Sequence, residues 1–136
     1  MNFDLFSMQM KMLGEYKRSL KDIEYEIDDI IYKYAGVRAI QYDKTRMAFN
    51  KNIADDMLDR MFEELKAPQK EKDRIENAIK ELEKICDINL DKLPKDVQKM
   101  CEMVYLNKLT YEFVGKLFGY TPSGLRYKIK AEVERI

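Results

Sequence analysis

Apolar side chains recur every three or four positions along most of the chain, and this spacing predicts amphipathic α-helices. The longest such segment is residues 4–35. Its apolar positions form a heptad seam, which is typical of a coiled coil or a long helical hairpin. Gly36 suits the position just after a helix, so we expect this helix to end there. The seam consists of Leu13, Tyr16, Leu20, Ile23, Ile27, Ile30 and Tyr34.

A second periodic segment covers residues 52–87, where Asn52 can cap the start of a helix. Pro68 interrupts this segment, and proline is tolerated in the first turn of a helix but disruptive in its interior. The pattern therefore fits either one kinked helix or two helices that are broken near residue 67. Either arrangement can fold back along residues 4–35, and a second copy of the chain can also cover the seam. An intrachain hairpin and a homodimer through the N-terminal arm stay open as alternatives.

Residues 36–51 connect the two segments and combine cations with aromatic side chains. Arg38, Lys44 and Arg46 lie near Tyr42 and Phe49 in the sequence. Because cations beside aromatic rings suit contacts with phosphates and bases, the three cations are candidates for a second contact with nucleic acid or RNA polymerase. The alternative interpretation of this basic connector is a solvated link.

The last part of the chain predicts short helices around a tight turn. After a helix over residues 95–107, Thr110 can cap a second helix that Gly119 ends. Thr121 can cap a third helix, with Pro122 at its first position. Two helices joined by a short glycine-containing turn cross steeply, as in a helix-turn-helix, whose second helix enters the major groove of DNA.

We therefore expect an all-α protein with two parts. The predicted arm covers residues 1–92 and consists of the long helix 4–35, the basic connector 36–51 and helices over 52–87. The predicted helix-turn-helix unit covers residues 93–136.

Charge is distributed unevenly between these parts, although the chain as a whole is neutral. Residues 1–92 carry 17 cations and 20 acids, whereas residues 93–136 carry 8 cations and 5 acids. No acid occurs between residues 121 and 131. This asymmetry indicates a basic working surface near the C-terminal end.

The third helix of this unit supplies most of the candidate DNA contacts. Arg126 can read a guanine edge, because its guanidinium can donate two hydrogen bonds there. Lys128 and Lys130 are candidates for phosphates, and Tyr127 for a sugar or a thymine methyl group. Ser123 lies in the first turn, where a helix N-terminus can meet a phosphate. The predicted DNA-binding residues are Thr110, Tyr111, Thr121, Ser123, Gly124, Arg126, Tyr127, Lys128 and Lys130.

Catalysis receives little support from the sequence. The chain has no histidine, no glycine-rich phosphate loop and no serine or cysteine beside a base. We therefore expect no enzyme activity and no cofactor. The carboxylates in residues 52–87 fit a solvated helix face; they include Asp55, Asp56, Asp59, Glu63 and Glu64.

The cysteine content argues against a metal site. Cys86 and Cys101 are the two cysteines, and a zinc site needs about four closely spaced ligands. We expect two buried or partly buried free thiols in a reducing compartment. No signal peptide and no apolar run of about 18 residues occurs, so we expect no membrane partner and a cytoplasmic location.

The sequence "YLNKLTYEFVGKLFGYTPSGLRYKIKAEVERI" (105–136) resembles the helix-turn-helix of region four of bacterial sigma factors. Leu109-Thr110 match the start of that pattern, Phe118-Gly119 its turn, and Ser123 begins the entry to its recognition helix. The chain as a whole resembles small sigma-like regulators of phages and prophages of the ArpU and RinA type. The resemblance implies promoter DNA and RNA polymerase as partners and regulation of transcription as the function.

The sequence departs from the family pattern at several positions. Gly115 replaces the usual alanine, Gly124 replaces a residue with a side chain, and Phe113 occupies a position that is usually polar. An alternative interpretation is therefore a protein-interaction module, or an inhibitor of a host protein, that uses the same helical scaffold.

Overall fold

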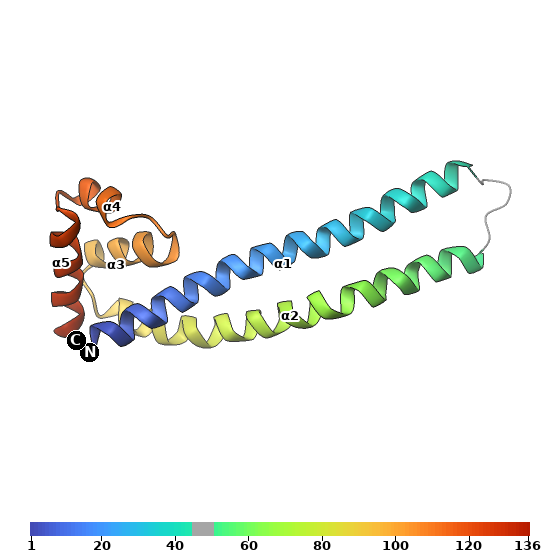
Figure 1. Cartoon of the computed structure of the whole chain (residues 1–136). Helices are drawn as coiled ribbons and strands as arrows, with labels where there is room; N and C mark the ends of the chain where they lie inside the picture. The colour runs from blue at the N-terminus through green and yellow to red at the C-terminus, as the bar shows by residue number, and fades with distance from the viewer. Residues whose placement is uncertain (45–50) are drawn as a thin grey trace. The chain divides into compact units, whose positions relative to one another are not determined.

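The computed structural model describes the backbone of residues 1–44 and 51–136 and the side chains of residues 1–35 and 55–136. Every element in this part of the chain is helical, which confirms the predicted all-α fold (Figure 1). The elements are α1 (Phe3–Lys44), α2 (Lys51–Asp91), α3 (Lys95–Cys101), the π-helical turn η1 (Glu102–Leu106), α4 (Tyr111–Phe118) and α5 (Pro122–Glu134).

The chain divides into two compact units. Unit 1 combines residues 1–18 with residues 77–136, and unit 2 is the contiguous segment 19–76. This division cuts across the predicted boundary at residue 92, because the first residues of α1 and the last residues of α2 belong with the C-terminal helices.

The core of unit 1 receives one apolar stripe of α1. Phe3, Phe6, Met10 and Leu13 are all buried, at the three- and four-residue spacing of one helix face. The ring of Phe6 packs edge-on against Tyr105, with 6.2 Å between ring centroids and an interplanar angle of 81°. The first turns of α1 therefore belong to the core that the C-terminal helices complete.

Gly14 allows α1 to approach η1 closely. A Cβ atom at this position would lie 2.4 Å from the carbonyl oxygen of Tyr105, which is too close for any side chain. One turn later, Arg18 donates a hydrogen bond to the carbonyl oxygen of Leu106 at 3.4 Å. From the sequence alone, a glycine inside a helix is expected only to weaken that helix. In the structure, Gly14 lies where α1 packs closely against the backbone of η1.

The predicted helix 95–107 appears as α3 followed by η1. Val97, Met100 and Cys101 are buried, as its apolar pattern indicates. The π-helical turn, in which the Asn107 N–H donates to the Glu102 carbonyl at 3.0 Å, fits one extra residue into the turn. Tyr105 is buried as a result.

Unit 2 pairs residues 19–44 of α1 with residues 51–76 of α2 in antiparallel orientation (Figure 1). The Tyr34 hydroxyl donates a hydrogen bond to Glu64 Oε1 at 2.7 Å, and Lys33 Nζ lies 3.3 Å from the same oxygen. The hairpin that the seam permitted within one chain is therefore present. Leu20, Ile23, Ile27, Ile30 and Tyr34 are half-buried along it.

The structure corrects the predicted end of the first helix. α1 continues through Gly36 to Lys44, so residues 36–44 of the predicted connector are helical. The physical reason is that a glycine inside a helix costs only about 1 kcal/mol relative to alanine, which neighbouring turns can offset. Arg38 and Lys44 lie on this extension, where side chains are not described, and Arg46 lies outside the described residues.

Pro68 does not break the second segment. A single helix, α2, runs from Lys51 to Asp91 with Pro68 inside it, which confirms the one-helix alternative and places its end four residues beyond the predicted one. Proline removes one backbone hydrogen bond from a helix interior. Its ring is buried here, so apolar burial offsets part of that loss.

Candidate nucleic-acid interface

The turn between α4 and α5 is built from local capping interactions. Thr110 Oγ1 accepts a hydrogen bond from the Phe113 N–H at 3.1 Å and caps α4. Gly119 ends α4 in the left-handed conformation, with φ 79°, which favours glycine. Thr121 Oγ1 accepts from the Gly124 N–H at 3.0 Å and caps α5. The predicted starts of both helices and the predicted end of α4 are confirmed.

Gly115 lets the turn fold back onto α4. The Tyr120 N–H donates to the Gly115 carbonyl at 2.7 Å, and a Cβ atom on Gly115 would lie 2.5 Å from the Tyr120 carbonyl oxygen. The alanine that is usual in the sigma pattern would therefore not fit this backbone without a shift. Glycine at position 115 therefore avoids a clash with the Tyr120 carbonyl oxygen.

α5 has a fully buried face and an exposed face. Leu125, Ile129 and Val133 have no exposed surface, as their spacing predicts. On the other side of the helix Ser123, Tyr127 and Lys130 are exposed, and Tyr127 exposes 73% of its surface. Gly124 is half-buried in the first turn, and Pro122 occupies the first helical position.

Arg126 lies apart from this exposed face. Its guanidinium carbon is 5.9 Å from the centroid of the Phe3 ring, a cation–π arrangement with the first turn of α1. The residue is exposed, and no carboxylate among the described residues lies within ion-pair distance of it. No local pattern in the sequence indicates that the candidate for base reading contacts α1.

Lys128 is also separated from the other predicted contacts. Its Nζ lies 3.2 Å from Glu132 Oε1, and Glu132 pairs with Arg135 at 3.0 Å as well. Glu132 is 8% exposed, and both cations lie within ion-pair distance of its carboxylate. Lys128 therefore already has an anionic partner within the protein.

The predicted residues at the start of α4 lie beside a network of hydroxyl groups. Ser7 Oγ and Tyr105 Oη are 3.0 Å apart. Burial raises the pKa of Tyr105 well above its usual range, and a hydrogen bond with Tyr111 acts in the same direction. Thr110 is exposed and Tyr111 half-buried, so both can be reached from solvent.

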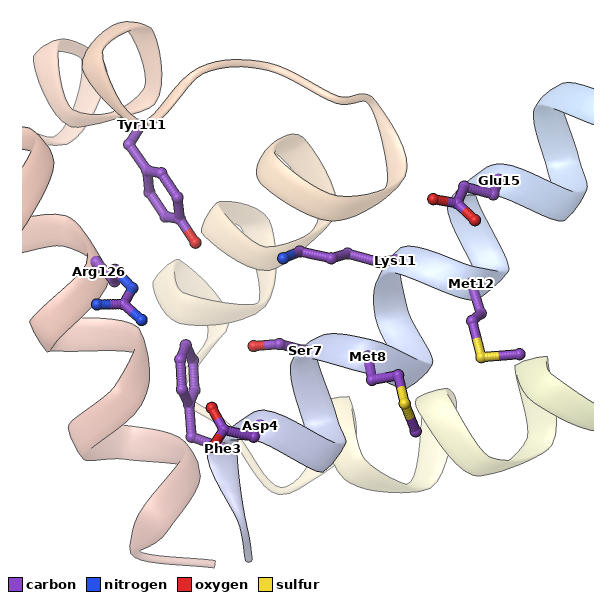
Figure 2. Close-up of a pocket in the computed structure, with 9 residues that line it drawn as sticks. All are labelled: Phe3, Asp4, Ser7, Met8, Lys11, Met12, Glu15, Tyr111 and Arg126. Atoms are coloured by element: carbon purple, nitrogen blue, oxygen red, sulfur yellow. The ribbon is translucent and has the colours of Figure 1, made fainter.

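A pocket of about 400 Å³ lies next to this network, between α1, α4 and α5 (Figure 2). Phe3, Ser7 and Lys11 reach it from α1, Tyr111 from α4 and Arg126 from α5. Sequence reasoning identified Tyr111 and Arg126 but missed the α1 residues, because only the tertiary fold brings residues 3–11 to the helix-turn-helix.

No protein-family model, curated protein or solved structure matches this chain. The resemblance to sigma region four therefore depends on the residues between 105 and 136 that carry the pattern.

An apolar pair remains exposed on α4. Phe113 exposes 51% of its surface and Leu117 exposes 56%. The spacing of Val114 and Leu117, three residues apart, predicts that both face the core, but Val114 is buried and Leu117 is exposed. The two side chains are four residues apart and so share one side of the helix.

The structure places the remaining candidate groups for chemistry apart or in the core. Among the described residues no three histidine, cysteine, aspartate or glutamate side chains lie close enough to hold a metal ion. Cys86 and Cys101 are free and buried, which confirms the expected thiols, and burial raises the pKa of Cys101 to about 12. The carboxylates from Asp55 to Glu64 are exposed, as expected for a solvated face.

Within residues 1–44 and 51–136, no helix contains an apolar stretch long enough to cross a bilayer.

Proposed function

We propose that this protein is a sequence-specific DNA-binding regulator of transcription with α5 as its recognition helix. The observation that supports this best is the arrangement of α4 and α5, two capped helices that turn at Gly119. The helix that follows the turn has one buried face and one exposed face. Lys130 lies on the exposed face and Arg126 lies apart from it, and neither forms an ion pair with a described carboxylate. The sigma-like pattern implies promoter DNA and RNA polymerase as partners and an origin in a phage or prophage.

The residues have distinct roles in this proposal. Ser123, Tyr127 and Lys130 face the major groove, with Lys130 at a phosphate. Arg126 reads a base edge once its side chain leaves Phe3, which is a rotamer change in an exposed residue. The Thr110 hydroxyl accepts the Phe113 N–H and still has its own proton to donate to a phosphate.

Salt dependence of binding to a DNA duplex tests the proposal. We expect the affinity, measured by fluorescence anisotropy, to fall steeply with salt, and Lys130→Ala to lower the slope of log K against log salt by about 1. Lys84→Ala is the matched control, because Lys84 is an exposed lysine of unit 1 on α2. Equal slopes for the two variants, or no binding at low salt, would contradict the proposal.

Selection from random duplexes tests the sequence preference. Arg126→Ala should remove the preference at one base pair, at a cost of about 1–3 kcal/mol for the preferred site, because a bidentate contact is lost. A preference that survives unchanged in Arg126→Ala would remove this residue from base reading.

A second candidate function is protein binding through α4, and the exposure of Phe113 and Leu117 supports it. We propose RNA polymerase or another host protein as the partner. If Phe113→Ala abolishes capture of that partner while Arg126→Ala leaves all binding unchanged, protein binding replaces DNA binding as the function.

A homodimer through the arm remains part of the proposal. Ile31, Tyr32 and Phe62 are exposed in unit 2, and a second copy could cover them. Sedimentation of the full chain over a range of concentrations gives its mass directly, and a monomer at all concentrations would exclude the dimer.

A further inference from the structure

The pocket between α1, α4 and α5 collects hydrogen-bond donors that the proposed recognition face does not account for. The ends of Lys11 and Tyr111 point toward one another in Figure 2, with the Ser7 hydroxyl below them and the Arg126 guanidinium to their left. Two of these groups are cations and two are hydroxyls. They come from three helices, so the fold and not one local motif assembles them.

The two cations of the pocket lack an anionic partner. Neither Lys11 nor Arg126 forms an ion pair with a described carboxylate, although Asp4 and Glu15 also line the pocket. Figure 2 shows the Asp4 carboxylate beside Phe3 and the Glu15 carboxylate at the far end from Arg126. Both acids line the same pocket, so the two cations without an ion pair share it with two carboxylates.

One further feature concerns Arg126 itself. The Arg126 guanidinium carbon lies 5.9 Å from the centroid of the Phe3 ring, a cation–π arrangement that favours this position of an exposed side chain beside the pocket.

We propose that this pocket binds a phosphoryl group. The Arg126 fork donates to two of its oxygens, and Lys11 and Tyr111 donate to the others, because guanidinium and ammonium groups are the protein's strongest phosphate partners. The phosphoryl group belongs either to the DNA backbone or to a small phosphorylated molecule. The first source rests on the proposed function and the second does not.

The two sources have different consequences for Arg126. A backbone phosphate would anchor DNA at α1 and α5 together. A free phosphorylated molecule would hold Arg126 in the pocket and away from a base edge, so it would compete with specific DNA binding.

Titration with pyrophosphate tests the small-molecule source. In the full chain we expect chemical-shift changes at Lys11, Tyr111 and Arg126, and a loss of affinity of about ten-fold in Lys11→Ala, as for removal of one charged hydrogen bond. Tyr111→Phe keeps the ring and should cause a smaller loss. Lys84→Ala carries the same change of charge outside the pocket and should bind like the unmodified chain.

The salt dependence of DNA binding tests the other source with the same variants. A slope that falls by about 1 in Lys11→Ala but not in Lys84→Ala indicates a backbone phosphate in the pocket. If Lys11→Ala matches Lys84→Ala in both titrations, the pocket proposal is overturned. If the protein binds no DNA, only the proposed DNA-binding function is excluded. The pyrophosphate titration would still test whether the pocket binds a phosphoryl group.

Discussion

Leu13 and Leu20 lie one heptad apart on the same seam of α1, yet their surroundings differ. Leu13, in unit 1, is 2% exposed, whereas Leu20, in unit 2, is half-buried. In unit 1 the helix also meets the η1 turn, with Gly14 against Tyr105. In unit 2 the helix has α2 as its neighbour within the unit.

This difference shows that a heptad seam specifies a face and not a depth of burial. Two leucines at equivalent seam positions differ in exposure, and we expect the more buried one to contribute more to stability. The number of neighbours, which depends on the whole fold, decides the energetic weight of each apolar residue.

Replacing each of the two leucines by alanine should give the largest difference in stability between the units. Leu13→Ala should destabilise the protein by about 2–5 kcal/mol, because a buried leucine leaves a cavity. Leu20→Ala should cost about 1 kcal/mol, because its side chain is already partly solvated. Urea unfolding followed by circular dichroism measures both, and equal losses would break the distinction between the units.

Gly14→Ala tests the close approach of α1 to η1 inside unit 1. The added Cβ would meet the Tyr105 carbonyl, so we expect a loss of about 1–3 kcal/mol from overpacking. The usual effect of replacing glycine by alanine in a helix has the opposite sign. Ser19→Ala, half-buried on the same helix, is the control and should be neutral or slightly stabilising. A stabilising Gly14→Ala would mean that α1 does not touch η1.

Alkaline pH should weaken unit 1 through Cys101. Burial raises the pKa of this thiol to about 12, above its unfolded value, so the folded state keeps the proton that the unfolded state loses. Stability should therefore fall as pH rises from about 9 toward 12, by up to about 1.4 kcal/mol per pH unit. Urea midpoints at pH 8 and pH 10 test this. Cys101→Ala should flatten the dependence, and an unchanged slope would assign the effect to other groups.

The smallest effect is expected in unit 2, at the exposed cluster around Glu64. The hydrogen bond from Tyr34 lowers the pKa of Glu64, and Lys33 acts in the same direction. The cluster therefore stabilises the folded state above the unfolded pKa of the carboxyl and is lost as pH falls below it. Glu64→Gln should shift the urea midpoint less than Leu20→Ala, and high salt should reduce the shift further. A shift as large as that of Leu13→Ala would mean that this cluster is not solvated.

Short-range chemistry made much of the fold predictable. Thr110, Gly119 and Thr121 act within a few residues of themselves, so their capping roles follow from the sequence and agree with the hydrogen bonds of the structure. The buried stripe of α5 follows from its spacing in the same way. DNA binding itself remains a prediction.

The predictions at Gly36 and Pro68 depended on single residues whose effect on a helix is small. A single glycine or proline changes a helix by a few kcal/mol at most, and neighbours decide the outcome, so Gly36 and Pro68 lie inside helices. The contact of Arg126 with Phe3 joins residues that are far apart in the chain. No local pattern encodes such a contact, and the pocket beside it was missed for the same reason.

The assembly of unit 1 from residues 1–18 and 77–136 has a consequence during translation. The ribosome releases Phe6 and Met10 long before α5 is made, and at ordinary elongation rates the delay is roughly 6–24 s. During that interval a strongly apolar stripe has no permanent cover and depends on chaperones or on transient shielding by nascent α2.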